Sequence, residues 1–270
     1  MKELLYSFAH VTAKEYQQLE SGIIEPNEQL KVKLILAKRL RLDYIEACLE
    51  ESNVRYITIH DNDYPPLLKE IYDPPYILYY RGNKKLLKNR MFAIVGSRKS
   101  ASYSKAALKQ IIPHLNQYTI VSGLAFGADD IAHRIALENN VPTIGVLAFG
   151  HSIHYPKVTL STRNIIEEKY ITISEFPPNS KIEKWKFVSR NRIIAGCADG
   201  TLVTEAEIGS GSLITLEMAM EENRHVFCLP GNMTSSLSVG TNLRIQEGCA
   251  PVVFPEDITS ILNNNTIFKN

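Results

Sequence analysis

Four short segments of the chain combine small, hydroxylated and cationic residues in a way that suits an anion. Two follow apolar runs, one is expected at the head of a helix, and one forms a turn before a helix. Backbone N–H groups in such turns donate hydrogen bonds to anions, and arginine contacts phosphate with a fork of N–H groups. We predict a phosphate-binding site made of Gly96, Ser97, Arg98, Ser122, Gly123, Gly127, Arg190, Asn191, Arg192, Ser210, Gly211, Ser212 and Thr215.

The motifs of nucleotide-dependent and hydrolytic enzymes are missing from these segments. The turn at Gly96 has no G-x-G-x-x-G fingerprint, and the run from Gly209 to Ser212 lacks the lysine of a P-loop. Neither Ser97 nor Ser122 lies in a G-x-S-x-G motif. Helix capping alone explains some of these serines and glycines when each is taken by itself. It does not explain why four such turns occur at one edge of the sheet. Donors without an acid–base pair favour phosphate binding over catalysis, so we expect no catalytic residue and no cofactor.

The histidines and cysteines do not form a convincing metal site. His151 and His154 lie three positions apart without a nearby third ligand, so a metal pair is the weaker alternative and we predict no metal. We expect His133, one turn into its helix, to make a structural hydrogen bond. The cysteines are widely separated among apolar residues, which predicts buried thiols; they are Cys48, Cys197, Cys228 and Cys249.

The charge of the chain is unevenly distributed although its net charge is only +1. No carboxylate lies between Asp73 and Asp129, while lysine and arginine occur at positions 81, 84, 85, 88, 90, 98, 99, 105 and 109. Aromatic residues, among them Tyr103 and Phe126, are interspersed with them. Basic and aromatic side chains together suit a polyanion that carries bases. A solvated face with acidic partners from elsewhere in the fold is an equal alternative.

Regular alternation of strands and helices must position these residues. From Met91 onward we expect strands at 92–95, 119–121, 143–147, 171–174, 201–204, 225–229 and 252–254, and helices near 103–116, 129–137, 162–169, 188–196 and 213–223. This pattern predicts an α/β fold, an extended Rossmann-like, doubly wound and mostly parallel sheet. In such sheets ligands bind outside the carboxyl ends of the strands, where the predicted turns fall. Residues 55–83 are expected to add a strand pair at the sheet edge.

Two domains are expected. Residues 1–54 are expected to form a small N-terminal helical module broken near Gly22 and Pro26, and residues 55–270 the extended Rossmann-like domain that would bind the polyanion. No run approaches 18 apolar residues, so no transmembrane span is expected and we predict a cytoplasmic protein.

The chain resembles the DNA-processing protein A family (DprA, also called Smf) across roughly residues 55 to 255. The resemblance rests on motifs that occur in the family's order. They are Asp63 to Leu68, Val95 to Arg98, Val121 to Ala125 with Gly127 and Ala132-His133, Tyr155-Pro156, Ser174-Glu175, Arg190 to Gly196, Glu205-Ala206, Ser210 to Thr215, Pro230-Gly231 and Gly240 to Asn242.

The resemblance implies a homodimer that binds single-stranded DNA without nucleotide or catalysis. It also implies that the protein protects incoming DNA and helps load the RecA recombinase during natural transformation. The DNA pocket would be lined by the phosphate-binding residues predicted above. Phe126 occupies a position that is usually basic in the family, and we expect it to offer a face for stacking a base. Leu243-Arg244 departs from the family pattern near the C-terminus, where it bears on the dimer contacts.

Two other function classes remain open. Gly200-Thr201 with Glu205 is weakly similar to the P-G-G-x-G-T-x-x-E motif of Rossmann-like nucleotide phosphoribohydrolases, and Glu175 would be the acid of such an enzyme. The paired glycines are missing and the spacing from threonine to glutamate is longer, so we rank this enzyme below the DNA-binding protein. A protein-interaction scaffold is the third class.

Overall fold

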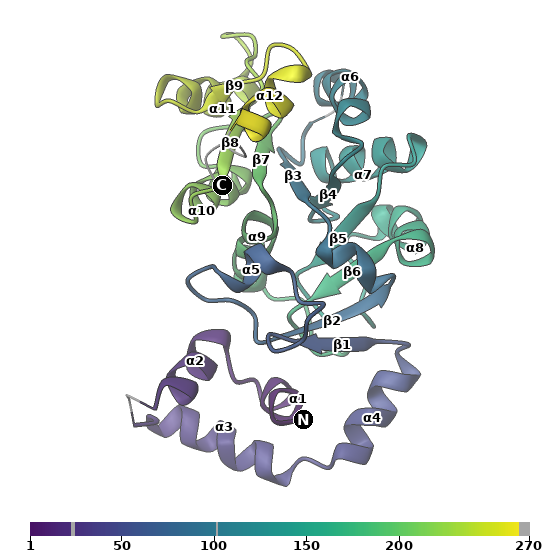
Figure 1. Cartoon of the computed structure of the whole chain (residues 1–270), viewed down its shortest axis with the longest axis vertical. Coiled ribbons are helices and arrows are strands. Elements are labelled where there is room, and N and C mark those ends of the chain that lie inside the picture. The colour runs from purple at the N-terminus through teal and green to yellow at the C-terminus, as the bar shows by residue number, and fades with distance from the viewer. Residues whose placement is uncertain (23–24, 101, 265–270) are drawn as a thin grey trace.

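A nine-stranded sheet forms the centre of the molecule in this computed structural model, which describes residues 1–22, 25–100 and 102–264 (Figure 1). Its order is β1-β2-β6-β5-β4-β3-β7-β8-β9, and β3 to β9 run parallel while β1 and β2 pair antiparallel at the β6 edge. The strands are β1 (Arg55–Thr58), β2 (Ile77–Gly82), β3 (Met91–Val95), β4 (Thr119–Ser122), β5 (Thr143–Leu147), β6 (Ile171–Ser174), β7 (Gly200–Val203), β8 (His225–Cys228) and β9 (Ala250–Pro251). The predicted doubly wound, mostly parallel α/β fold is confirmed.

The direction of winding reverses next to β3. The chain moves outward through β4, β5 and β6, then returns across the sheet to place β7 on the other side of β3. Connections that leave β3 and β7 in opposite directions open a crevice at the carboxyl ends of these two strands. The topology therefore marks the end of β3, where the predicted turn at Gly96 lies, as the place for a ligand.

Helices cover both faces of the sheet because residues along each central strand alternate between two cores. Phe92 and Ile94 pack against α6, α7 and α12, whereas Ala93 and Val95 face the core that holds α5, α9 and α10. The helices after β1 are α5 (Pro66–Lys69), α6 (Ser102–Ile111), α7 (Ala128–Glu138), α8 (Leu160–Lys169), α9 (Lys184–Cys197), α10 (Gly211–Glu221), α11 (Ser236–Gln246) and α12 (Glu256–Asn264). Short 3-10 helices are η1 (Lys84–Lys88), η2 (Ile112–Leu115) and η3 (Lys157–Thr159).

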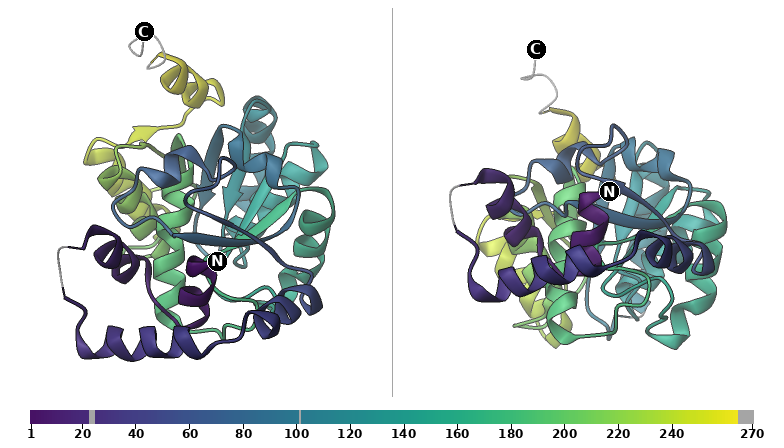
Figure 2. Two further views of the ribbon diagram at one scale, coloured as in Figure 1. Left: turned by 60° about the horizontal axis from the view of Figure 1, so that its bottom comes forward. Right: turned by 90° about the horizontal axis from the view of Figure 1, so that it is seen from below.

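Four helices precede the sheet and lie together at the β1–β2 end of the molecule (Figure 2). They are α1 (Lys2–Phe8), α2 (Ala13–Ser21), α3 (Glu28–Arg39) and α4 (Leu42–Glu51). Their core includes Tyr76, directly before β2, and Tyr79 within β2. The hydroxyls of these two residues donate to Val11 O and Ser7 Oγ, both at 2.8 Å. The predicted helical content of residues 1–54 is confirmed, while the domain boundary at residue 54 stays a prediction.

Two predicted elements differ from the structure. Helix α9 begins at Lys184, one turn before the predicted start, so Arg190 to Arg192 lie in its middle and not at its head. The last strand is β9, and the predicted strand at 252–254 is wrong. The N–H groups of Val253 and Phe254 both donate to Asp257 Oδ2 at 2.8 Å, which turns the chain into α12.

Membrane-spanning helices are not found among the described residues, where every helix is too short or too polar to cross a bilayer. All four cysteines are buried free thiols, as predicted. Cys228 Sγ and Cys249 Sγ lie 3.5 Å apart.

Two histidines are enclosed in the core and favour the neutral form. His133 Nδ1 lies 2.7 Å from Thr143 Oγ1, which confirms the predicted structural hydrogen bond, and His151 Nε2 lies 3.3 Å from Thr172 O. Burial lowers the pKa of each imidazole to about 3. The unfolded chain regains a histidine pKa near 6.5, so between these values it binds more protons than the folded chain.

This difference predicts acid destabilisation that begins near neutrality. The free energy of unfolding should fall by up to about 1.4 kcal/mol per pH unit for each buried histidine as the pH drops below about 6.5. His133→Gln should remove the contribution of one histidine from the slope of the free energy of unfolding against pH. Urea denaturation between about pH 6 and pH 5 measures this slope. Gln117→Ala, at an exposed position without a titrating group, is the control and should leave the slope unchanged. A His133→Gln slope equal to that of the wild type would contradict the prediction.

Candidate nucleic-acid interface

A cavity of about 440 Å³ lies at the crevice between β3 and β7. Its walls come from the turn after β3, the beginning of α7, the middle of α9 and the beginning of α10. The predicted site residues that line it are Gly96, Ser97, Arg98, Arg190, Asn191, Ser210, Gly211, Ser212 and Thr215. Three of the four predicted segments thus meet in one place, although more than a hundred residues separate the first from the last.

The first turn is held by backbone contacts that leave no room for larger residues. Ser97 N donates to Glu205 O at 2.7 Å, which ties the end of β3 to the segment after β7. A Cβ on Gly96 would lie 2.4 Å from Thr204 Oγ1 and 2.7 Å from Ala128 Cβ. Glycine is therefore required at position 96 for the two strand ends and α7 to approach one another.

The second turn supports the cavity from behind. Gly127 has φ +90°, and a Cβ there would lie 2.5 Å from Ser97 O. Ser122 is buried, and its Oγ donates to Ile94 O at 2.6 Å. Ser122 and Gly127 therefore do not line the cavity as the sequence suggested, because they join the second turn to the first.

A buried cation and a buried carboxylate fix the second turn between them. Gly123 N donates to Asp129 Oδ2 at 3.2 Å, and Gly123 O accepts from Arg190 Nη1 at 2.6 Å. Arg190 Nη1 also donates to Val146 O at 2.7 Å, so it links α9 to β5. Burial lowers the pKa of Arg190 to about 10, opposed by the charge of Asp129, and so the guanidinium is protonated at neutral pH. Burial raises the pKa of Asp129, opposed chiefly by Arg190.

Arg98 is the cation of this cavity whose charge is not compensated. Lys99 Nζ pairs with Glu207 at 2.9 Å, and Arg190 is balanced by nearby Asp129. Within the described chain, no carboxylate lies within ion-pair distance of Arg98, whose exposed guanidinium lies 5.9 Å from the centroid of the Phe187 ring. An exposed guanidinium held over an aromatic ring keeps its N–H groups available for an anion.

Helix α10 adds donors on the opposite wall. Ser210 Oγ caps this helix by accepting from Ser212 N at 3.4 Å, and Asn191 Nδ2 donates to Gly211 O at 3.4 Å. The helix has eleven residues and its N-terminus opens on the cavity, as does the beginning of α7. The helix dipole favours negative charge at the beginning of α10. At the beginning of α7, the N–H groups of Ala128 and Asp130 already donate to Ser97 O and Ala125 O, both at 3.2 Å.

A second, smaller cavity of about 60 Å³ adjoins the first, and its lining is mainly apolar with four aromatic residues. Arg98, Arg190 and Phe187 are common to both, and Gly123 and Phe126 line the smaller one. Phe126 is 53% exposed, and Tyr155 lies edge-on to Phe187 with ring centroids 5.9 Å apart. An anion beside Arg98 would thus have aromatic rings next to it.

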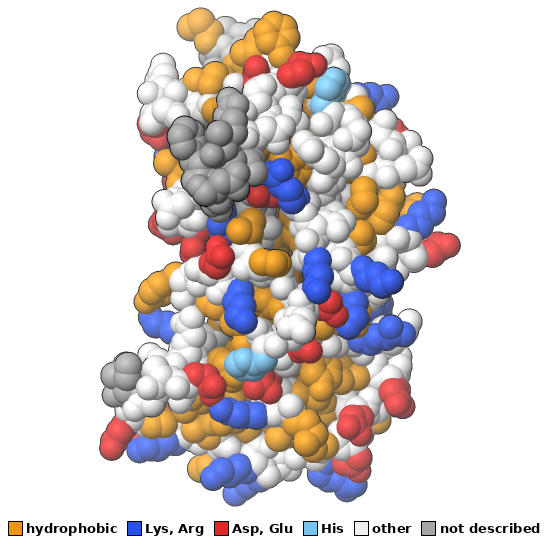
Figure 3. Space-filling model, viewed as in Figure 1, with side chains coloured by type: hydrophobic (Ala, Val, Ile, Leu, Met, Phe, Trp, Pro, Cys, Tyr) orange, Lys and Arg blue, Asp and Glu red, His pale blue; other side chains and the backbone are white. Residues whose placement is uncertain are grey.

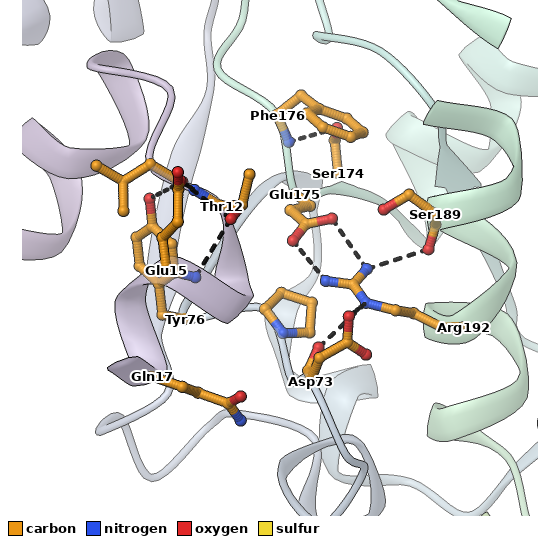
Figure 4. Close-up of polar contacts among 12 residues, drawn as sticks. Thr12, Glu15, Gln17, Asp73, Tyr76, Ser174, Glu175, Phe176, Ser189 and Arg192 are labelled. Carbon is orange, nitrogen blue, oxygen red and sulfur yellow. Dashed lines mark hydrogen bonds and ion pairs between the residues drawn. The ribbon is translucent and has the colours of Figure 1, made fainter. Parts of the chain in front are cut away.

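Arg192 does not belong to this site. Its Nη1 and Nη2 donate to Glu175 at 2.9 and 2.6 Å, and its Nε lies 3.0 Å from Asp73 Oδ2. Figure 4 shows the guanidinium pointing from α9 toward these two carboxylates. Residues 190 and 192 are about 200° apart around a helix with 3.6 residues per turn, so they face opposite sides of α9. The prediction that Arg192 contacts phosphate at this cavity is therefore withdrawn.

The basic segment predicted as a polyanion surface is partly paired with acids from elsewhere in the fold. Arg81 pairs with Glu167, Lys84 and Lys88 with Asp63, and Arg90 with Asp199. Figure 3 shows lysine and arginine side chains across the middle of one face with carboxylates among them. The alternative of a solvated, paired face thus describes five of the nine cations of this segment. Among the described residues, no carboxylate lies within ion-pair distance of the other four, which are Lys85, Arg98, Lys105 and Lys109.

The acids of the alternative enzyme lie outside the cavity. Glu175 is engaged by Arg192, and Glu205 Oε2 accepts from Ser104 Oγ at 2.6 Å. His151 is buried against Thr172, and no group of three potential metal ligands occurs among the residues that the structure describes. The residues missed by sequence reasoning are Lys99, Asp129, Phe187 and Glu207. Phe187 was detectable, since it precedes Arg190 by three positions and so shares its helix face.

Comparison with known proteins gives consistent matches. A sequence model of the family described as DNA recombination-mediator protein A matches residues 55–264. DNA processing protein DprA of Streptococcus pneumoniae is 43% identical over 226 residues, 83% of this chain and 80% of that protein. DprA of Bacillus subtilis is 37% identical over 225 residues, 81% of this chain and 74% of that protein.

Solved structures agree with these matches. The X-ray structure of DNA processing protein A from Streptococcus pneumoniae has a TM-score of 0.83 at 33% identity, and covers 96% of this chain and 93% of that one. A structure of DNA processing protein A from Helicobacter pylori, described with its single-stranded DNA binding mode, has a TM-score of 0.71 at 28% identity. It covers 79% of this chain and 98% of that one.

The arrangement around Gly123 predicts strong coupling between Arg190 and Asp129. Arg190→Met should lower the free energy of unfolding by about 3 kcal/mol, because it leaves a buried carboxylate without its balancing charge. Asp129→Asn should lower the free energy of unfolding much less in the Arg190→Met variant than in the wild type. A double-mutant cycle by urea denaturation measures this coupling, and additive costs would contradict it.

Proposed function

Because the chain belongs to the DNA recombination-mediator protein A family, we propose that it binds single-stranded DNA in the cavity between β3 and β7. We propose further that it protects incoming DNA and helps load the RecA recombinase onto it during natural transformation, in the cytoplasm. The Helicobacter pylori relative, described as binding single-stranded DNA, supports the first part of this proposal.

The observation that carries the proposal is the uncompensated charge of Arg98 in the same cavity as the N-terminus of α10. Phosphate groups meet N–H donors from the beginning of α10 on one side and the guanidinium of Arg98 on the other. These contacts recognise the sugar-phosphate chain, which is the same for every sequence. Binding is therefore insensitive to base sequence and strongly dependent on salt.

The smaller cavity beside Arg98 accounts for a preference for single strands over duplexes. A base released from pairing stacks on the exposed ring of Phe126, close to Tyr155 and Phe187. Bases in a duplex are already stacked and cannot enter such a site. Phe126 thereby replaces the phosphate contact of a basic residue with a contact to the base.

We propose binding and not catalysis as the activity of this site. Both acids that line the cavity are engaged, since Asp129 accepts from the second turn and Glu207 pairs with Lys99. The competing nucleotide phosphoribohydrolase would release free base from a nucleoside monophosphate. Detection of that release would favour the enzyme over the binding protein.

Removing the guanidinium of Arg98 tests the proposed phosphate contact. Arg98→Ala should weaken binding to all single-stranded sequences about tenfold and reduce the slope of log K against log salt by about 0.7. Fluorescence anisotropy of labelled oligonucleotides at two salt concentrations measures both quantities. Lys109→Ala removes an equal charge from an exposed position on α6 and is the control. A loss confined to particular sequences, or the same loss in both variants, would refute the contact.

We also propose that the protein is a homodimer, as the family resemblance implies. Val253 and Phe254 directly follow edge strand β9 and are 64% and 65% exposed, which supports an interface at this edge. Phe254→Asp should convert the dimer into a monomer in sedimentation equilibrium. Val32→Asp, at a similarly exposed apolar position on α3, should leave it dimeric. A monomeric wild type would refute the proposal.

A further inference from the structure

A separate cavity of about 680 Å³ lies on the other side of α9. It is enclosed by α1, α2 and α3 on one side, and by α9 and the segment between β6 and α9 on the other. In Figure 4, Thr12 and Tyr76 lie across from Glu175, Ser189 and Arg192 in this region. None of the predicted site residues except Arg192 lines it.

Most charges in this cavity are satisfied within the protein. Arg192 pairs with Glu175 and Asp73, as described above. Lys186 Nζ pairs with Glu183 at 2.8 Å and donates to Lys181 O at 2.8 Å, while Lys33 pairs with Glu15 at 2.7 Å. These groups are three cations and four carboxylates, so they supply no excess positive charge to a ligand.

An aromatic pair forms part of the wall and is held by a buried lysine. Phe176 and Trp185 are perpendicular, with ring centroids 5.8 Å apart. Lys186 Nζ lies 4.9 Å from the centroid of Phe176 and 5.6 Å from that of Trp185. Trp185 remains 54% exposed, so the indole is both positioned and accessible. A fixed and accessible indole is a platform on which a planar group stacks.

Two lysines remain uncompensated where the cavity opens. Lys14 on α2 and Lys181 before α9 line the cavity from opposite walls, and both are exposed. Among the described residues, neither has a carboxylate within ion-pair distance. The cavity thus combines an aromatic platform with two available cations, which suits a ligand that carries a planar ring and negative charge.

Helix α9 is shared by this cavity and the proposed DNA site. Phe187, Val188 and Asn191 face the first cavity, whereas Trp185, Ser189 and Arg192 face the second. An α-helix with its side chains is about 10–12 Å across, so a strand of a few nucleotides reaches from one cavity to the other over the N-terminal turn of α9.

We propose that the second cavity is a further subsite for the same single strand, with a base stacked on Trp185 and phosphates beside Lys14 and Lys181. This inference rests on the proposed function. An acidic peptide with an aromatic side chain would meet the same lysines, but the shared helix favours DNA. The subsite gives the N-terminal helices a part in DNA binding, since Lys14 comes from them.

Trp185 is the only tryptophan of the chain, so its fluorescence reports on this subsite directly. An oligothymidylate of about 20 nucleotides should quench the emission, whereas one of about 4 nucleotides should bind the first cavity and leave it unchanged. Trp185→Ala should weaken binding of the long oligonucleotide about tenfold and leave binding of the short one unchanged. Trp185→Phe should retain most of the affinity for the long oligonucleotide. Lys14→Ala and Lys181→Ala should each reduce the salt slope by about 0.7, with Lys109→Ala as control.

Anisotropy of labelled oligonucleotides separates failure of this inference from failure of the proposed function. Tight binding of the long oligonucleotide, with unchanged Trp185 emission and neutral Trp185 and lysine variants, would overturn the subsite and leave the function intact. Absence of any binding to single strands would overturn both. Quenching by poly-glutamate but not by DNA would also overturn the subsite, and would assign the cavity to an acidic protein segment.

Discussion

The opposed placement of Arg190 and Asp129 around Gly123 is the interaction on which the rest of the site depends. A Cβ at position 123 would lie 2.0 Å from Arg190 Nη1, so only glycine admits the guanidinium to the carbonyls of Gly123 and Val146. The carboxylate of Asp129 holds the N–H side of the same turn. Two strand ends and two helices are thereby joined by one buried pair of charges. With the second turn fixed, Gly127 supports the backbone at Ser97 and Arg98, and Arg98 can point outward uncompensated.

The helical geometry of α9 divides the cations of this region into two classes. Arg190 faces the crevice between β3 and β7, where it is structural, and Arg192 faces the N-terminal helices, where two carboxylates neutralise it. Burying a guanidinium is costly unless charge and hydrogen bonds compensate it, so neither of these side chains is available to a ligand. The exposed Arg98 is available. The distribution of charge around α9 therefore leaves the turn after β3 as the place where we propose that an anion binds.

Local sequence pattern was sufficient to predict the fold and much of the site. Apolar runs ending in glycine placed β3 and β4 and their turns, and the small-residue run at Ser210 placed the beginning of α10. Such patterns do not predict which charged residues pair when they lie far apart in the sequence. Arg192 pairs with Glu175 and Asp73, and Lys84 and Lys88 pair with Asp63. The predicted start of α9 was one turn too late. The prediction also assigned Arg190 and Arg192 to one site, although residues two apart in a helix face different sides. Val252 to Phe254 looked like a strand because β propensity cannot detect that Asp257 caps this segment.

Hydrogen–deuterium exchange with and without an oligothymidylate tests the central claim most directly, since the claim concerns backbone donors at defined turns. The account predicts slower exchange of amides in residues 96–99 and 210–215 on addition of DNA, and little change in α6 or α11. Protection confined to other parts of the molecule, with these two turns exchanging as in the protein alone, would contradict it.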